Sequence, residues 1–434
     1  MTHDDRHGYQ RLVSKEIFMK TKAVRLYGKN DLRLEEFELP DIKDDEILAR
    51  VVTDSICMST LKAARQGADH KRVPADIASN PVITGHEFGG ELVEIGAKWK
   101  SKYEPGQKFA LQTALNYKGT LDAPGYSYQY IGSNATYVVI PNEVMELDCL
   151  LPFNGDAFFY ASLSEPMSCI IGGFNAQYHT SPGSYEHKMG IVEGGNVALL
   201  AGAGPMGLGS VDYLIHCGRK PGMIVVTDID EARLKRAGRI ITVEEAAKNG
   251  VTLLYVNSSD PDELIGLTGG RGFDDVCVNV PVASVVELGG RILGRDGCLN
   301  MFAGPSDPAF AAPFNFYNVH YAANHIVGVS GGNSADMLEA LELMEKGLID
   351  PAIMITHVGG LDCAIDTILN LDKIPGWKKL IYSHISMPLT AIEDFEKMDG
   401  PVFQTLAGIV KKNGGFWSAE AEKFLLEAAM KEKR

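Results

Sequence analysis

The feature that most constrains this chain is a glycine-rich turn, Gly202-Ala203-Gly204-Pro205-Met206-Gly207. It follows a short apolar run at 196–201 and opens an apolar helical pattern at 206–217. Asp228 ends the next apolar run, at the roughly twenty-residue spacing of a dinucleotide-binding fingerprint. Strand, turn and helix in this order predict a nucleotide site in which the helix N-terminus faces the pyrophosphate.

Each residue of this turn has an expected part in binding the cofactor. Gly202 permits the tight turn, Gly204 lets the backbone approach the pyrophosphate, and Gly207 permits close packing of the helix on the strand. Pro205 and Met206 complete the predicted cofactor-binding turn.

Asp228 indicates which cofactor to expect. A carboxylate at this strand end can accept hydrogen bonds from the ribose diol and would repel a 2′-phosphate, which favours NAD(H). Arg233, Lys235 and Arg236 follow shortly afterwards, so use of NADP(H) stays open. The alternative interpretation is that Asp228 serves as the N-cap of the helix that starts at Asp230.

The hydrophobic pattern divides the chain. Up to about residue 140, segments rich in β-branched residues are separated by short turns, which predicts an antiparallel β domain. From 196 to about 332, apolar runs alternate with helical patterns, which predicts a doubly wound parallel sheet. A helix at 334–346, a strand at 353–358 and an amphipathic helix at 419–431 are expected to follow.

Composition limits the partners and the compartment. With 434 residues, of which 45% are hydrophobic and 22% charged, the chain is long enough for two or three domains. Its formal net charge of −15 and the lack of a long basic block disfavour nucleic acid and membrane partners. Seven scattered cysteines without a CxxC pair, and a charged N-terminal stretch without an apolar core, predict a cytoplasmic protein.

A second set of residues suggests a metal site. Cys57, His86, Glu87 and Glu165 offer a thiolate, an imidazole and two carboxylates, a donor set of mixed softness that suits zinc. A single histidine in an apolar turn is more often a hydrogen-bonded core residue than a ligand. The interpretation therefore depends on the combination of these residues with the nucleotide fingerprint.

Together, these motifs resemble the zinc-dependent medium-chain alcohol and polyol dehydrogenases. The resemblance begins at Met19 and is carried by Cys57-x-Ser59, Gly85-His86-Glu87, Glu165-Pro166, the 202–207 turn, Asp228 and Ile355-Thr356-His357. Further segments are similar to the bacterial sorbose-phosphate reductase branch of that family: 25–28, 66–71, 315–321 and 417–422.

The resemblance implies an α/β protein with a GroES-like β-rich catalytic domain and an inserted Rossmann domain. The expected parts are an N-terminal extension at 1–18, the catalytic domain at 19–170 and 333–390, the Rossmann NAD-binding domain at 171–332 and a C-terminal helical extension at 391–434. By position, Cys57, His86 and Glu165 match zinc ligands, and Glu87 matches a carboxylate that binds or neighbours the metal. The stretch 99–130 lacks the four cysteines of the family's structural zinc, so one catalytic Zn²⁺ and no structural zinc are expected.

The expected catalytic residues are Ser59 and Glu87. Ser59 lies two residues from a metal ligand and is expected to protonate the developing alkoxide, although it could instead cap a short helix at 59–65. Thr60 and Lys62 stand where many relatives carry an acidic residue and a histidine. The histidine of the usual proton relay is therefore missing.

The resemblance implies NAD(H)-dependent, zinc-assisted reduction of a ketose phosphate, L-sorbose 1-phosphate, to a hexitol phosphate, D-glucitol 6-phosphate. His70, Lys71 and Arg72 form a basic run in an acidic chain and are predicted to bind the substrate phosphate, with a solvated surface loop as the alternative. Two other functions stay open: a polyol dehydrogenase acting on an unphosphorylated sugar alcohol, and a nucleotide-binding protein of the same fold without redox chemistry. A homo-oligomer, either a dimer or a tetramer, is expected.

Overall fold

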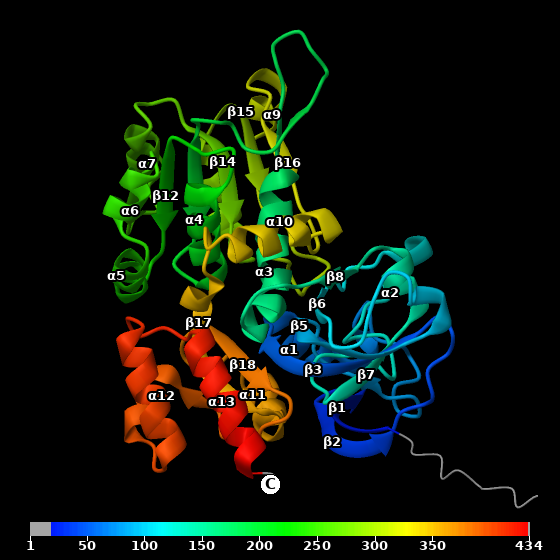
Figure 1. Ribbon diagram of the computed structural model, residues 1–434. Helices are drawn as coiled ribbons and strands as arrows, with labels where there is room; N and C mark the ends of the chain where they lie inside the picture. The colour runs from blue at the N-terminus through cyan, green and yellow to red at the C-terminus, as the bar shows by residue number, and fades with distance from the viewer. Residues whose placement is uncertain (1–18, 433–434) are drawn as a thin grey trace, which may run out of the picture.

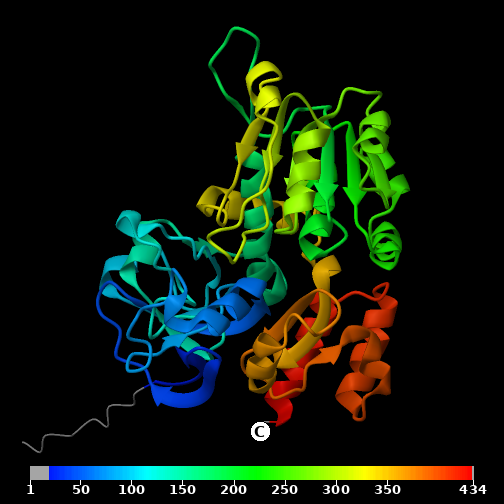
Figure 2. The same cartoon turned by 180° about the vertical axis from the view of Figure 1, so that it is seen from behind.

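The computed structural model describes residues 19–432, and the predicted extension at 1–18 lies outside them. Figures 1 and 2 show two bodies, a parallel-sheet body and a β-rich body, with the helix α3 (Phe158–Asn175) running between them. Within residues 19–432, no helix is both long enough and apolar enough to span a bilayer.

The parallel-sheet body confirms the predicted doubly wound fold. Its six strands lie in the order β13-β12-β11-β14-β15-β16, and every neighbouring pair is parallel. The strands are β11 (Asn196–Leu200), β12 (Met223–Thr227), β13 (Thr252–Val256), β14 (Phe273–Val278), β15 (Leu293–Asn300) and β16 (His325–Val327). The helices of this body are α4 (Pro205–His216), α5 (Glu231–Ile240), α6 (Val243–Lys248), α7 (Pro261–Leu267), α8 (Ala283–Ile292) and α9 (Phe316–Tyr321). The next helix, α10 (Ser334–Glu345), packs on α3, and its Met337 and Leu341 share a core with Ala110 of the β-rich body.

The β-rich body is built from both ends of the chain. An eight-stranded sheet runs β19-β17-β18-β3-β5-β6-β8, with β7 also paired to β3. Its strands are β3 (Ile47–Ile56), β5 (Phe88–Ile95), β6 (Lys108–Leu111), β7 (Tyr137–Ile140), β8 (Leu150–Pro152), β17 (Ile355–Gly360), β18 (Lys378–Tyr382) and β19 (Thr390–Ala391). Because β18 pairs with β3, the late strands share a sheet with the strand that leads into Cys57.

Smaller elements complete the two bodies. A three-stranded sheet contains β2 (Asp31–Glu38), β1 (Lys20–Gly28) and β4 (Val82–Ile83), and a hairpin contains β9 (Tyr178–His179) and β10 (Lys188–Met189). The other α-helices are α1 (Met58–Gln66), α2 (Asn142–Glu146), α11 (Ala364–Leu369), α12 (Pro401–Lys412) and α13 (Ala419–Glu432). Short 3-10 turns occur at Gly67–Asp69, Ala97–Trp99, Tyr117–Gly119, Pro351–Met354, Leu361–Cys363 and Ile392–Lys397.

The helix α3 connects the two bodies. Fifteen of its 18 residues are buried, so it lacks the polar face that marks an amphipathic helix in a sequence. It packs against strands β3, β5 and β6 on one side and against α4 and α10 on the other. The helix spans the boundary expected between residues 170 and 171, so a shift of α3 would be felt in both bodies.

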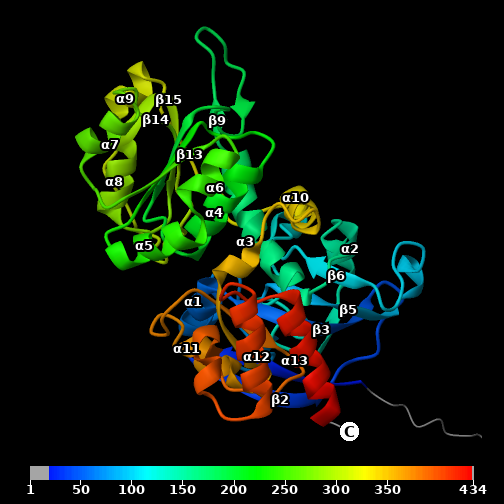
Figure 3. The same cartoon turned by 60° about the vertical axis from the view of Figure 1, so that its left-hand side comes forward.

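The last two helices pack against the β-rich body. α12 and α13 lie beside β17 and β18 in Figure 1, Figure 3 shows the two helices side by side, and Trp417 is fully buried. Leu406, Trp417 and Leu425 belong to the same hydrophobic core as Phe159 of α3 and Leu380 of β18. These helices therefore share a core with the element that joins the two bodies.

Candidate active site

Three predicted ligand residues come together beside the eight-stranded sheet. Cys57 follows β3, and His86 and Glu87 precede β5, the neighbour of β3 in the sheet. One donor atom from each of the three lies within 4.8 Å of the other two. A thiolate, an imidazole and a carboxylate at this spacing can share one metal ion, and the set is chemically suited to zinc.

The turn that presents His86 depends on Gly85. Its φ of +86° is in the region that disfavours side chains, and a Cβ added there would lie 2.4 Å from the Ser133 hydroxyl oxygen. The Gly85 carbonyl also accepts a 2.9 Å hydrogen bond from the Ser133 backbone N–H. A glycine is therefore required directly before the two ligand candidates.

His86 is held in the form that can bind a metal. Its Nδ1 lies 3.3 Å from the hydroxyl of Thr60, so a proton on Nδ1 can be donated there and leave Nε2 with its lone pair. Burial lowers the pKa of His86, which keeps the imidazole neutral near pH 7. The site therefore fits a metal ion in two ways: its donor atoms lie close together, and the imidazole of His86 is neutral.

Glu87 is engaged by a lysine that the sequence analysis did not identify. Lys378 Nζ lies 2.5 and 2.7 Å from the two carboxylate oxygens, and Ser55 donates a hydrogen bond to Oε2. Burial acts to lower the pKa of Lys378, but the negative charges of Glu87 and Cys57 outweigh it and raise that pKa. The Glu87 carboxylate is therefore held by Lys378, and a metal ion would have to compete with this lysine for it.

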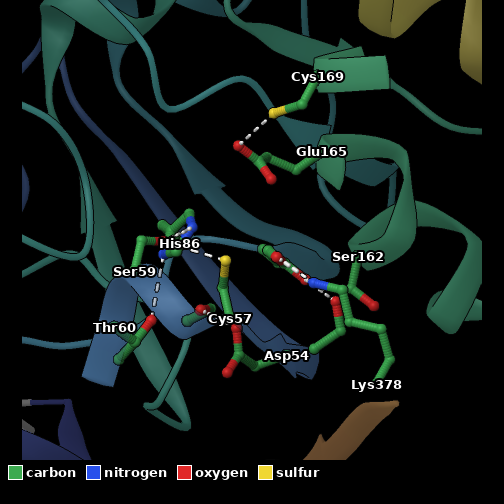
Figure 4. Close-up of polar contacts among 12 residues, drawn as sticks. Asp54, Cys57, Ser59, Thr60, His86, Ser162, Glu165, Cys169 and Lys378 are labelled. Atoms are coloured by element: carbon green, nitrogen blue, oxygen red, sulfur yellow. Dashed lines mark hydrogen bonds and ion pairs between the residues drawn. The ribbon is translucent and has the colours of Figure 1, made fainter. Parts of the chain in front are cut away.

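Glu165 approaches the site from α3, but it is not one of the three residues whose donor atoms lie within 4.8 Å of one another. Figure 4 shows its side chain extending toward the group formed by Cys57 and His86. The thiol of Cys169, one helical turn further on, lies 3.5 Å from Glu165 Oε1. Burial raises the pKa of Cys169 well above its usual value, so it stays a neutral thiol that can donate to the carboxylate.

Ser59 and Tyr126 form a hydroxyl pair next to the ligands. Ser59 Oγ lies 3.0 Å from the Cys57 sulfur and 3.2 Å from His86 Nε2, and Tyr126 donates a 2.9 Å hydrogen bond to it. The interpretation of Ser59 as a helix cap is wrong, because the N-cap of α1 is Cys57 and Ser59 lies inside the first turn. Tyr126 comes from an irregular loop, and no sequence signal marked it.

The glycine-rich turn has the geometry of a phosphate-binding loop. A Cβ on Gly207 would lie 1.9 Å from the Gly202 carbonyl oxygen, so only glycine permits this approach of α4 to β11. Gly204 is the N-cap of α4 and supplies no side chain to cap it, while the space beside Gly204 is open. The first N–H groups of α4 are thus available to an anion.

Asp228 lies at the end of β12 and is mostly buried. The helix α5 is capped by Asp230, whose side chain accepts from the N–H groups of Ala232 and Arg233, so the interpretation of Asp228 as this cap is wrong. Asp228 Oδ1 accepts a 3.0 Å hydrogen bond from the Asp230 N–H. The other carboxylate oxygen has no hydrogen-bond partner among residues 19–432, which leaves it open to a ligand.

Each of the three basic residues that follow Asp228 already contacts another side chain. Arg233 lies 3.6 Å from Asp230, and Lys235 lies 3.5 Å from Glu231. Arg236 stacks over the ring of Trp377, at 4.5 Å from its centroid, and so connects the parallel-sheet body to the β-rich body.

A group of cations borders the hydroxyl pair. The ring of His70 stacks on Tyr126 at 5.6 Å, and the guanidinium of Arg72 lies 5.9 Å from the same ring. Lys62 donates a 2.9 Å hydrogen bond to the carbonyl of Gly304 in the parallel-sheet body. Among residues 19–432, no carboxylate forms an ion pair with Lys62, Lys71 or Arg72, although nearby Lys29 and Arg65 pair with Asp69 and Asp372.

The positive charge of the neighbouring residues affects the pKa of His70. Burial and the charges of Arg72, Lys71 and Lys62 lower the pKa of His70 to about 4. His70 is therefore neutral near pH 7, and Lys62, Lys71 and Arg72 are positive charges without a carboxylate partner among residues 19–432, in a chain whose net charge is −15. The fold also brings Lys62 close to His70, Lys71 and Arg72, which the sequence did not predict.

Comparisons with known proteins agree with this architecture. Residues 43–148 match the alcohol dehydrogenase GroES-like domain, and residues 205–346 match the zinc-binding dehydrogenase family. The chain is 51% identical over 414 residues to mannitol-1-phosphate 5-dehydrogenase of Aliivibrio fischeri, covering 94% of this chain and 98% of that protein. It is 49% identical over 409 residues to L-sorbose 1-phosphate reductase of Klebsiella pneumoniae, again covering 94% and 98%.

A solved structure supports the fold independently. A Sinorhizobium meliloti protein, described as a zinc-binding dehydrogenase and bound to NADP, superposes with a TM-score of 0.67 at 21% identity. The match covers 84% of this chain and all of that one.

Proposed function

This chain belongs to the zinc-binding medium-chain dehydrogenases, and on that premise we propose that it reduces a ketose phosphate such as L-sorbose 1-phosphate to a hexitol phosphate such as D-glucitol 6-phosphate, using NADH. The observation that carries the phosphate specificity is the cluster of Lys62, His70, Lys71 and Arg72 beside Ser59. The names of two relatives that are about half identical to the chain point to the same class of substrate.

We assign one zinc ion to Cys57, His86 and Glu165, with Glu87 as a carboxylate that either binds the metal or remains paired with Lys378. The neutral imidazole of His86 and the clustering of Cys57, His86 and Glu87 support a metal at this place, while Glu165 is included because of the family resemblance. When bound, zinc polarises the substrate carbonyl as a Lewis acid, and NADH supplies the hydride.

The protein residues orient the substrate and move the proton. Ser59 Oγ is placed to donate a proton to the oxygen that becomes the alcohol, and Tyr126 OH donates a hydrogen bond that orients Ser59, which regains its proton from solvent water. Burial raises the pKa of Tyr126 well above its usual value, so its hydroxyl stays protonated and can donate. This pair would take the place of the relay histidine, at whose position the chain has Lys62.

NADH is favoured over NADPH by the groups around Asp228. The carboxylate is placed to accept hydrogen bonds from the ribose diol, and the nearby cations Arg233 and Lys235 are neutralised by Asp230 and Glu231. A 2′-phosphate would meet this carboxylate without a free cation from those two residues to offset the repulsion.

The experiment that tests this function measures NADH oxidation with a panel of sugar phosphates and the matching free sugars. Lys71→Ala and Arg72→Ala should each raise KM for the phosphorylated ketose by about one to two orders of magnitude, since a charged hydrogen bond contributes about 1.5–3 kcal/mol. KM for the free ketose should hardly change. Lys29→Ala is the matched control, because Lys29 is exposed nearby and already paired with Asp69.

Other outcomes would identify the remaining functions. Equal effects on phosphorylated and free ketose, with better turnover of the free sugar, would favour a polyol dehydrogenase. A protein that binds NADH but oxidises it with no member of the panel would instead be a nucleotide-binding protein of this fold.

A further inference from the structure

Glu422 of the C-terminal helix α13 is a buried carboxylate that contacts α3. It is 2% exposed, and its oxygens accept hydrogen bonds from the backbone N–H groups of Phe158 and Phe159 and from the hydroxyl of Tyr382. Phe158 and Phe159 are the first two residues of α3. A residue more than 260 positions away in sequence therefore caps this helix.

The start of α3 has no cap of its own. Its N-cap residue is Ala157, whose side chain cannot accept a hydrogen bond. Pro166 lies inside the helix and lacks an N–H, so the backbone bond that would tie the first turns to the remainder is missing at that point. Without Glu422, the start of the segment Phe158–Glu165 would therefore be uncapped, and Pro166 removes one backbone hydrogen bond at its other end.

Glu165 is the last residue of this segment and a predicted zinc ligand. It lies two helical turns from the capped N–H groups, so a displacement of the helix start moves its carboxylate relative to Cys57 and His86. Strand β18 also connects Glu422 to the site. Lys378 at one end of the strand contacts Glu87, and Tyr382, at the other end and on the same face, contacts Glu422.

We propose that Glu422 is a positioning residue for the metal site, and that the C-terminal helices hold the start of α3 so that Glu165 keeps its place opposite Cys57 and His86. This rests on the proposed assignment of Glu165 as a ligand. The family models that match the chain end at residue 346, so they do not include α13.

The charge state of Glu422 makes this role measurable. Burial raises the pKa of Glu422 to about 7, while the hydrogen bonds from Tyr382, Phe158 and Phe159 act in the opposite direction. The charged group facing it from the sheet is Lys108 of β6, and Tyr160 of α3 and Tyr382 of β18 are the titratable hydroxyls around it. Above pH 7 the carboxylate is ionised and interacts most strongly with the N–H groups of a helix start.

The test compares Glu422→Gln with Glu420→Gln in the full chain. The glutamine of the first variant keeps the side-chain volume and one acceptor oxygen but never carries charge, while Glu420 is an exposed residue of the same helix paired with Lys412. Zinc affinity is measured by competition with a chelator, alongside kcat and melting temperature. At pH 8.5, Glu422→Gln should weaken zinc binding by about threefold to tenfold, the range expected from losing a charged helix cap, and should lower kcat with little change in KM for NADH.

The pH dependence separates positioning by charge from simple stabilisation. At pH 6 wild-type Glu422 is mostly protonated, so wild type and Glu422→Gln should bind zinc nearly alike, whereas Glu420→Gln should match wild type at both pH values. A lower melting temperature with unchanged zinc affinity, or a loss of affinity that is the same at both pH values, would overturn the proposal.

A third variant separates this proposal from the ligand assignment. If Glu165→Gln leaves zinc affinity unchanged, Glu165 is not a ligand and the premise fails. If Glu165→Gln weakens zinc binding and Glu422→Gln does not, the ligand assignment stands and the positioning role is wrong.

Discussion

At the scale of single residues, the neighbours of a side chain decide what it can do. Cys57 has the hydroxyl of Ser59 on its sulfur and two further donor residues within reach, whereas Cys363 donates to the backbone carbonyl of Gly360. The two thiols are chemically identical in the unfolded chain. Only the first lies where a metal ion can be shared.

We expect one zinc ion per chain, because one ligand cluster is present within residues 19–432 and it contains a single cysteine. Cys57→Ala should reduce the zinc content from near one to near zero and abolish turnover, since a catalytic zinc needs about three protein ligands. Elemental analysis measures this, with Cys363→Ala as the control that retains its metal. A content near two in wild type, or an active and zinc-loaded Cys57→Ala, would contradict the assignment.

His70 should lower the stability of the folded protein at acidic pH. Its pKa is lowered to about 4, below the unfolded value near 6.5, so between these values the unfolded chain binds a proton that folded His70 does not. This residue therefore reduces stability as pH falls from about 6.5 to about 4, and His70→Gln should lessen that loss.

A bound phosphate dianion should raise the pKa of His70, which an NMR titration with inorganic phosphate can follow. His357 provides an internal control, because burial and Lys379 lower its pKa to about 4 as well, and its ring lies outside the proposed phosphate site. A His70 pKa that phosphate leaves unchanged would remove the cluster from the substrate site.

Asp228→Ser should shift the ratio of kcat/KM toward NADP, because the carboxylate that would repel a 2′-phosphate is gone. Asp260→Ser is the control: it changes the N-cap residue of a different helix, α7, and should leave the preference between the two cofactors unchanged. A wild-type enzyme that already prefers NADP would show that the attraction of the cations after Asp228 for a 2′-phosphate outweighs the repulsion by its carboxylate.

At the scale of elements, helix starts organise both halves of the site. The start of α4 has no side-chain cap, so its N–H groups are available to the proposed cofactor, while the start of α3 is capped by Glu422 from another element. The position of each helix start therefore affects the part of the site that the helix approaches.

Gly207→Ala should weaken NADH binding by about tenfold or more, because the added methyl group would push α4 away from β11 and displace the N–H groups that face the pyrophosphate. Fluorescence titration with NADH measures the change. Gly266→Ala is the control, since a Cβ there meets no atom within 4 Å. Unchanged affinity in Gly207→Ala would show that the turn does not bind the cofactor.

At the scale of the whole molecule, one edge of the parallel sheet is open and apolar. β16 is an edge strand with Ile326 51% exposed, and α9 beside it exposes Phe316, Tyr317 and Tyr321 by more than 60% each. Large exposed apolar patches of this kind favour association. We therefore expect the predicted homo-oligomer to form through this edge.

Ile326→Asp combined with Phe316→Asp should shift the native mass toward the monomer, because a charge on each side of the contact cannot be buried without a partner. Sedimentation velocity measures the mass, and zinc content should be unchanged. Val243→Asp is the control, as it lies on α6 near the opposite edge of the sheet. A wild-type monomer would contradict this expectation.

Local patterns predicted the parts of the fold whose cause is local. The 202–207 turn, the alternation of strand and helix after residue 196 and the place of Asp228 at a strand end follow from short-range spacing, which the structure reproduces in β11, α4 and β12. The C-terminal helix was also predicted closely, since its apolar residues recur with a helical period. In contrast, α3 was not predicted, because a helix buried on nearly every side shows no such period.

The sequence by itself determined the fold family and the glycine-rich turn, because their signals are local, and it supplied Cys57, His86, Glu87 and Glu165 as candidate donors through their combination with that turn and the family resemblance. Only the tertiary structure decided that Lys378 holds Glu87, that Tyr126 contacts Ser59, and that Glu422 caps α3. These contacts join segments that no short pattern connects. They form because burial of the shared core brings distant strands and helices together, and a polar group enclosed in that core must find its partner there.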